Sequence, residues 1–193
     1  GRVFESILSI APPIHAVMPK PQTDEARAPL TLEELVDVLV KAKRLDPAKT
    51  PEIVGRATTL RSQVLKERVG SVRSQAAARY EASPAELVAV LRLMDASNPK
   101  RTLDEDVIAE TIAAAADMPY LKIDPLKIDN DLVAKTLSRP FAHRHVVIPI
   151  AREKDAIAIA VTDPFDTALR DSLEQLIQAP LRYVVAATCD IIA

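Results

Sequence analysis

Apolar residues recur at helical spacing from Thr31 to about Arg44. Thr31 and Glu34 have the spacing of a capping box, in which each side chain accepts a hydrogen bond from the backbone N–H of the other residue. Asp46 and Pro47 end the pattern, because proline lacks the amide hydrogen that a helix interior needs. The apolar positions are Leu32, Leu35, Val36, Leu39 and Val40. The pattern predicts an amphipathic helix.

A longer helix is expected from Thr50 to about Tyr80, with Thr50 as its N-cap and Pro51 in its first turn. Its apolar residues form two stripes, rotated by roughly a quarter turn at about 100° per residue. The first stripe is Ile53, Ala57, Leu60 and Val64, and the second is Leu65, Val69, Val72, Ala76 and Tyr80. Two explanations stay open: the helix breaks near Leu65, or its two ends pack against different surfaces.

Two further helices are predicted before the pattern changes. Residues 83–86 form another capping box with proline at the first helical position, and this predicts a short buried helix to about Met94. Pro99 breaks the helical pattern. Thr102 with Glu105 then predicts the start of the next helix.

The second half contains strand patterns. Val146–Ile150 and Ala156–Val161 predict a β-hairpin, in which Pro149 indicates an edge or a bulge. A helix over about Asp166–Gln178 and a third strand at Leu181–Ala186 follow. The residues of this helix expected to point inward are Leu169, Leu173, Leu176 and Ile177. The predicted fold class is α+β: a helical N-terminal half, then a small sheet module of β-β-α-β order with helices packed on one side.

The chain is expected to divide into three segments. Residues 1–29 contain five prolines and predict an extended tail. Residues 30–100 predict a helical subdomain, and residues 101–193 an α+β domain. Because the chain begins with glycine, we expect it to be a piece of a longer protein.

Composition excludes several classes of protein. The chain has 193 residues, of which 48% are hydrophobic, and its net charge of −2 does not suggest a polycation for nucleic acid or membrane. Aromatic residues make up only 3%, too few for a surface on which bases stack. No apolar run approaches the roughly 20 residues of a membrane span. Cys189 is the single cysteine, which excludes an intramolecular disulfide and indicates a reducing compartment.

The sequence shows no enzyme motif. Phosphate loops need several glycines, and this chain has three, in no phosphate-binding pattern. His143 and His145, with one distant cysteine, have no zinc spacing. The carboxylates near turns, such as Asp129 and Asp163, are explained by capping. We therefore predict no catalytic residue, no cofactor and no metal.

A basic segment is the candidate partner-binding site. The residues predicted to form it are Arg56, Arg61, Lys66, Arg68 and Arg73, and Glu67 is the only acidic residue among them. Arg61 and Arg68 are seven apart and so share a helix face. One interpretation is a docking surface for an acidic partner or a phosphate. The alternative is an ordinary solvated helix face.

The second half also resembles a known family. The segments that carry the resemblance are Met118–Pro125, Arg144–Ile150, Ala156–Pro164 and Thr188–Ile191. In that order they are similar to the N-terminal domain of type II secretion and type IV pilus assembly ATPases, the general secretory pathway E family. Over about Leu103–Ala193, the resemblance implies a bacterial regulatory and docking domain, with an ATPase domain lying beyond Ala193.

The resemblance also implies partners. Such a domain links the motor to the cytoplasmic domain of an inner-membrane assembly-platform protein, which implies a cytoplasmic location, peripheral to that membrane. A related domain in pilus motors binds cyclic di-GMP through an Arg-Leu-Gly start, and this chain lacks that start around Leu30–Leu45. Two alternatives stay open: a sensor for cyclic di-GMP or another phosphate compound, and a scaffold that carries the domain without a motor.

Overall fold

The computed structural model describes residues 29–71 and 81–192. The chain divides into two compact units, here called the helical unit (Leu30–Thr111) and the sheet unit (from Ile112 onward). The predicted tail over residues 1–28 and the end of the predicted long helix over 72–80 lie outside the described residues. Each unit is described by itself.

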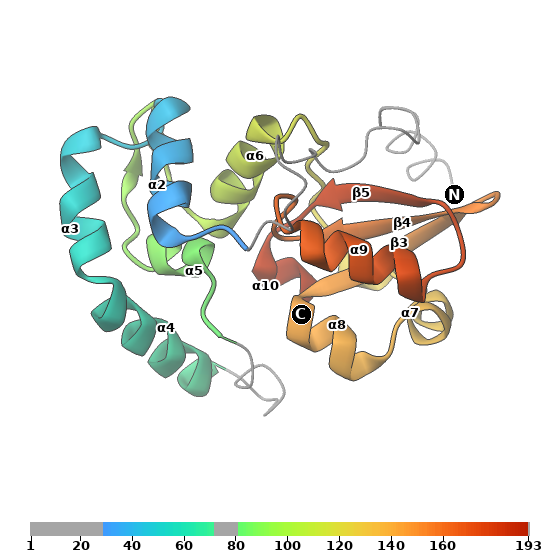
Figure 1. Cartoon of the computed structure of the whole chain (residues 1–193). Helices are drawn as coiled ribbons and strands as arrows, with labels where there is room; N and C mark the ends of the chain where they lie inside the picture. Colours follow the sequence, from blue (N-terminus) through green and yellow to red (C-terminus); the bar gives the residue numbers. More distant parts are fainter. Residues whose placement is uncertain (1–28, 72–80, 193) are drawn as a thin grey trace. The chain divides into compact units, whose positions relative to one another are not determined.

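The helical unit contains short helices and one small hairpin (Figure 1). Its elements are α2 (Leu32–Lys41), η1 (Pro47–Lys49), α3 (Thr50–Gly55), α4 (Ala57–Ser71), α5 (Pro84–Ala89), β1 (Met94–Asp95), β2 (Asn98–Thr102) and the start of α6 (Glu105–Ala115). The predicted capping box of α2 is present: Glu34 N donates to Thr31 Oγ1 over 3.2 Å, and Thr31 N donates to Glu34 Oε2 over 2.9 Å. The predicted apolar stripe packs inward, since Leu35, Val36 and Leu39 are all buried.

The structure corrects three local predictions in this unit. The predicted long helix is broken at Arg56, between α3 and α4, and not near Leu65. Thr50 is not an N-cap, because the preceding turn already leads into α3 and makes it the first helical residue. Thr102 lies in β2, and Asp104 instead accepts the hydrogen bond from Val107 N over 2.8 Å at the start of α6.

The small hairpin was also missed by the sequence analysis. Helix α5 ends at Ala89 rather than near Met94, and β1 then pairs antiparallel with β2. Met94 is 55% exposed, and every residue of β2 is exposed. Because neither strand buries a row of apolar side chains, the sequence has no apolar alternation here that could have indicated a strand.

The sheet unit has the predicted β-β-α-β order. Its elements are the end of α6, η3 (Pro125–Lys127), α7 (Asn130–Thr136), α8 (Arg139–His145), β3 (Val147–Glu153), β4 (Ala156–Val161), α9 (Thr167–Leu176), β5 (Leu181–Val185) and α10 (Thr188–Ile191). Strands β3 and β4 are antiparallel, and β4 and β5 are parallel through the α9 crossover. The register shifts between Pro149 and Ala151 in β3, the outer strand, as its proline predicted.

Both faces of the central strand β4 are covered, since all six of its residues are buried. Alternation along the strand separates the alanines from Ile157, Ile159 and Val161. The alanine face packs against Ile123 and Ile150, with Ile191 of α10 beside them. Figure 1 shows α9 lying across the sheet. One of the residues of α9 predicted to point inward was assigned wrongly: Leu176, at the end of the helix, is 57% exposed.

The mixture of helices and small sheets confirms the α+β class. Among the described residues, none of the helices combines the length and apolar character needed to cross a bilayer.

Candidate docking surfaces

The cations singled out in the sequence do not gather on one face. Arg56 is the C-cap of α3, and its Nη1 lies 3.3 Å from Glu52 Oε1. Arg61 and Lys66 are exposed on α4. They are five positions apart on the helix, so they point about 140° apart. Arg73 lies outside the described residues.

Arg68 is buried, which corrects its place in the predicted surface. Its side chain is 8% exposed, although Arg61 lies on nearly the same side of α4. The difference arises because α5 packs against α4. Arg68 Nη2 and Nε lie 2.5 and 3.2 Å from Glu86 Oε1. This arginine is therefore part of the internal structure and is removed from the candidate surface.

The Glu86 carboxylate serves two purposes at once. Its Oε2 accepts hydrogen bonds from Ser83 N (2.8 Å) and Ser83 Oγ (2.9 Å), which completes the predicted capping box of α5. Its Oε1 pairs with Arg68. Because both oxygens are engaged, a buried charge is tolerated that would otherwise be costly. The pair joins α4 to the first turn of α5.

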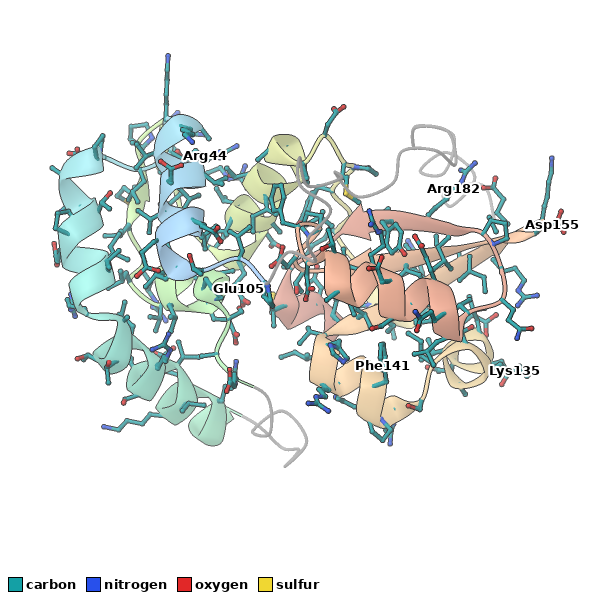
Figure 2. The ribbon with its side chains drawn as sticks, in the orientation of Figure 1. Arg44, Glu105, Lys135, Phe141, Asp155 and Arg182 are labelled. Carbon is teal, nitrogen blue, oxygen red and sulfur yellow. The ribbon has the colours of Figure 1, made fainter. Side chains whose placement is uncertain are left out.

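A second buried carboxylate fixes the small hairpin. Asp95 has no solvent exposure, and it accepts hydrogen bonds from Arg44 Nη1 (2.7 Å), Ser97 N (2.8 Å) and Ser97 Oγ (2.6 Å). Burial alone would raise the pKa of Asp95, but the hydrogen bonds from Ser97 and the charge of Arg44 outweigh it and hold the pKa below its ordinary value of 3.8. Arg44, labelled in Figure 2, also lies 3.9 Å from Glu110.

In the sheet unit, the Asp-Pro motif that carried the family resemblance forms the turn from β4 to α9. Asp163 Oδ1 accepts a hydrogen bond from Phe165 N over 2.9 Å. Asp166 then caps α9, accepting from Leu169 N over 3.0 Å. Such turns are typical of aspartate, whose short side chain mimics a backbone acceptor. The motif therefore sets the path of the chain between strand and helix.

The Asp-Ile motif near the end also has a structural explanation. Asp190 lies on α10 and its side chain is 10% exposed. It accepts hydrogen bonds from Lys122 Nζ over 2.8 Å and from Ile123 N over 3.2 Å. Ile123 belongs to the apolar cluster beneath the sheet. Asp190 thus ties the segment that precedes η3 to the last helix, across 67 residues of sequence.

His143 and His145 lie in the last turn of α8, shortly before β3 begins. The rings of His145 and Phe141 are 4.4 Å apart. Burial lowers the pKa of His145, with a further contribution from the charge of Arg144. Val146 follows in a left-handed conformation (φ 51°) and turns the chain into β3.

The sheet unit matches the model of a known domain family. Residues 116–193, less than half of the chain, match the model of the MshEN domain. No curated protein matches the chain in sequence. This match falls where the sequence resembles the N-terminal domain of secretion and pilus-assembly ATPases, so the resemblance is confirmed over these residues.

The solved structures similar to the chain include one of MshE and one of XpsE. A structure of MshE with cdg is 19% identical, covers 82% of this chain and 93% of its own, and has a TM-score of 0.47. A structure of the N-terminal domain of XpsE is 17% identical, covers 86% of this chain and 94% of its own, and has a TM-score of 0.48.

Proposed function

We propose that the chain is a non-catalytic regulatory and docking domain of a secretion or pilus-assembly ATPase, which binds the cytoplasmic domain of an inner-membrane platform protein. The observation that supports this proposal is the MshEN match over residues 116–193. The motif residues in that region, Asp163 and Asp190, hold turns and segments together.

The proposed contact in the helical unit is the exposed part of α4. Arg61 and Lys66 have no ion pair or hydrogen bond from their side chains within the described residues, so each offers an unneutralised charge to an acidic partner, on different sides of α4. Charge complementarity of this kind raises association rates and selects partners. Arg56 forms an ion pair with Glu52, so we expect it to contribute less to the binding of an acidic partner.

The direct test is binding of the purified chain to the cytoplasmic domain of the platform protein from the same organism, measured by biolayer interferometry. We expect binding that Arg61→Glu with Lys66→Glu weakens at least about fivefold, because both exposed charges would then repel an acidic partner. Lys100→Glu, an exposed cation on β2, is the matched control and should bind as the unmodified chain does. Absence of binding would refute the docking proposal, and equal loss in the control would refute the role of α4.

A sensor for cyclic di-GMP or another phosphate compound is the second candidate. The observation that favours it is the exposed guanidinium of Arg61, since such groups bind phosphate oxygens. Calorimetric titration of the chain with cyclic di-GMP tests it. Micromolar or tighter binding that Arg61→Glu abolishes would support the sensor, and no heat at two temperatures would exclude cyclic di-GMP as the ligand.

A further inference from the structure

Acidic residues are missing from a long stretch of the sheet unit. No aspartate or glutamate occurs from Leu132 to Arg152, although charged residues make up 27% of the whole chain. The cationic and titratable residues in this stretch are Lys135, Arg139, His143, Arg144, His145 and Arg152. Helix α8 lies at the centre of the stretch and carries four of the six.

At about 100° per residue, Arg139 and His143 lie about 40° apart on α8, and Arg144 lies about 140° from Arg139. The two arginines therefore stand at the borders of a broad arc, with His143 between them. Arg139 and Arg144 are exposed, and His143 is half-buried. Phe141 and His145 lie on the other side with their rings in contact. Figure 2 labels Phe141 on α8 and Lys135 on the neighbouring α7.

Most other cations of the sheet unit are neutralised within it. Their partners lie at 2.8 to 3.9 Å. The pairs are Lys122–Asp190, Lys127–Asp124, Lys135–Asp131, Arg170–Glu174 and Arg182–Glu153. By contrast, within the part of the chain that the structure describes, the side chains of Arg139, His143 and Arg144 have neither an ion pair nor a hydrogen bond.

The helix itself does not account for so much charge. A helix C-terminus carries a partial charge of about −0.5, which a single cation in the last turn compensates. Arg144 already occupies that turn, and Arg139 stands at the opposite end of α8, where a cation is unfavourable. The helix dipole therefore does not explain the exposed Arg139.

We propose that the α8 face formed by Arg139, His143 and Arg144 binds an acidic segment of a protein partner. Guanidinium groups are weakly hydrated and donate two hydrogen bonds to a carboxylate in one plane. A membrane is a poorer match, because the large apolar residues that the described structure exposes do not lie on α8. These residues are Leu65, Met94, Leu126 and Leu176. Nucleic acid binding usually needs a larger set of cations.

This surface lies on a different helix from the contact proposed on α4, and its test does not use the platform protein, so the two tests can succeed or fail independently. The probe is a fluorescein-labelled peptide of about ten glutamates, long enough to follow the roughly 10 Å length of α8. Fluorescence anisotropy of the full chain with this probe, at low salt and again at about 0.3 M salt, gives the affinity and its screening.

Arg139→Glu with Arg144→Glu should lower the affinity for the peptide at least about fivefold, and the binding to the unmodified chain should weaken at higher salt. Arg152→Glu is the control for a charge reversal elsewhere in the unit, to be compared with Arg139→Glu and Arg144→Glu made singly, since Arg152 is exposed and lies at the far end of β3, about 17 Å of strand beyond Val147. It should change the affinity less than twofold. Circular dichroism spectra of all variants confirm that they fold.

Three results would overturn the proposal. The first is no binding of the peptide at low salt. The second is an equal loss of binding in Arg152→Glu, which would mean that the peptide reports general charge. The third is binding of vesicles of phosphatidylglycerol that the α8 variant abolishes while peptide binding stays unchanged, which would assign the face to a lipid surface.

Discussion

Replacing Glu86 by glutamine tests the buried ion pair that joins α4 to α5. The carboxylate uses one oxygen for Arg68 and the other for Ser83. An amide offers a single acceptor oxygen, so either the arginine or the cap must lose its partner, and Arg68 keeps an uncompensated charge. Breaking a fully buried pair costs about 3–5 kcal/mol. Because the two side chains retain 8% and 10% exposure, we expect about 3 kcal/mol, the lower end of that range.

Hydrogen exchange followed by mass spectrometry measures this loss locally, which suits a chain of two units whose unfolding need not be two-state. At about 1.4 kcal/mol per factor of ten, peptides covering Leu60–Arg68 and Pro84–Ala89 should exchange roughly a hundredfold faster in Glu86→Gln. Glu67→Gln makes the same charge change at an exposed position of α4 and should have little effect.

A neutral pair should restore much of the protection. Arg68→Met with Glu86→Gln removes the stranded charge and leaves one acceptor for the cap, so the double variant should be more stable than Glu86→Gln alone. Unchanged exchange in Glu86→Gln would show that the pair contributes nothing, and the packing of Arg68 against Glu86 would then need another explanation.

Three further changes test other parts of the structure. Asp190→Ala should destabilise the sheet unit by about 1.5–3 kcal/mol, because the charge-assisted hydrogen bond to Ile123 N is lost, and denaturant unfolding measures this. The lowered pKa of Asp95 contributes stability that is present above its ordinary pKa of 3.8 and is lost as the pH falls through the folded value. The stability difference between the unmodified chain and Asp95→Asn should therefore shrink as the pH falls below about 4. Leu173→Ala, at a position without exposure, should cost about 2–5 kcal/mol, whereas Leu126→Ser, at 95% exposure, should cost under about 0.5 kcal/mol by thermal melting.

Helix caps and strands depend on residues close together in the chain, and local sequence patterns predicted them. The capping boxes at Thr31 and Ser83 were confirmed, because their partners lie three residues away. The strands β3, β4 and β5 were predicted from their apolar patterns, and Pro149 correctly indicated an irregular edge strand. These features need no knowledge of the rest of the fold.

Contacts between distant segments could not be predicted in this way. Arg68 shares a helix face with Arg61, and only the packing of α5 distinguishes the buried arginine from the exposed one. Burial of Asp95 is tolerated because Arg44, 51 residues earlier, compensates its charge. The cationic face of α8 had a signal that sequence reasoning missed: the absence of acidic residues from Leu132 to Arg152.

Binding to the platform protein tests the central claim most directly. The measurement is the affinity of the purified chain for the cytoplasmic domain of the platform protein from the same organism, with Arg61→Glu plus Lys66→Glu and the control Lys100→Glu measured alongside. The docking proposal predicts binding that the first variant weakens at least about fivefold and the control leaves unchanged. No binding by a folded chain would contradict it.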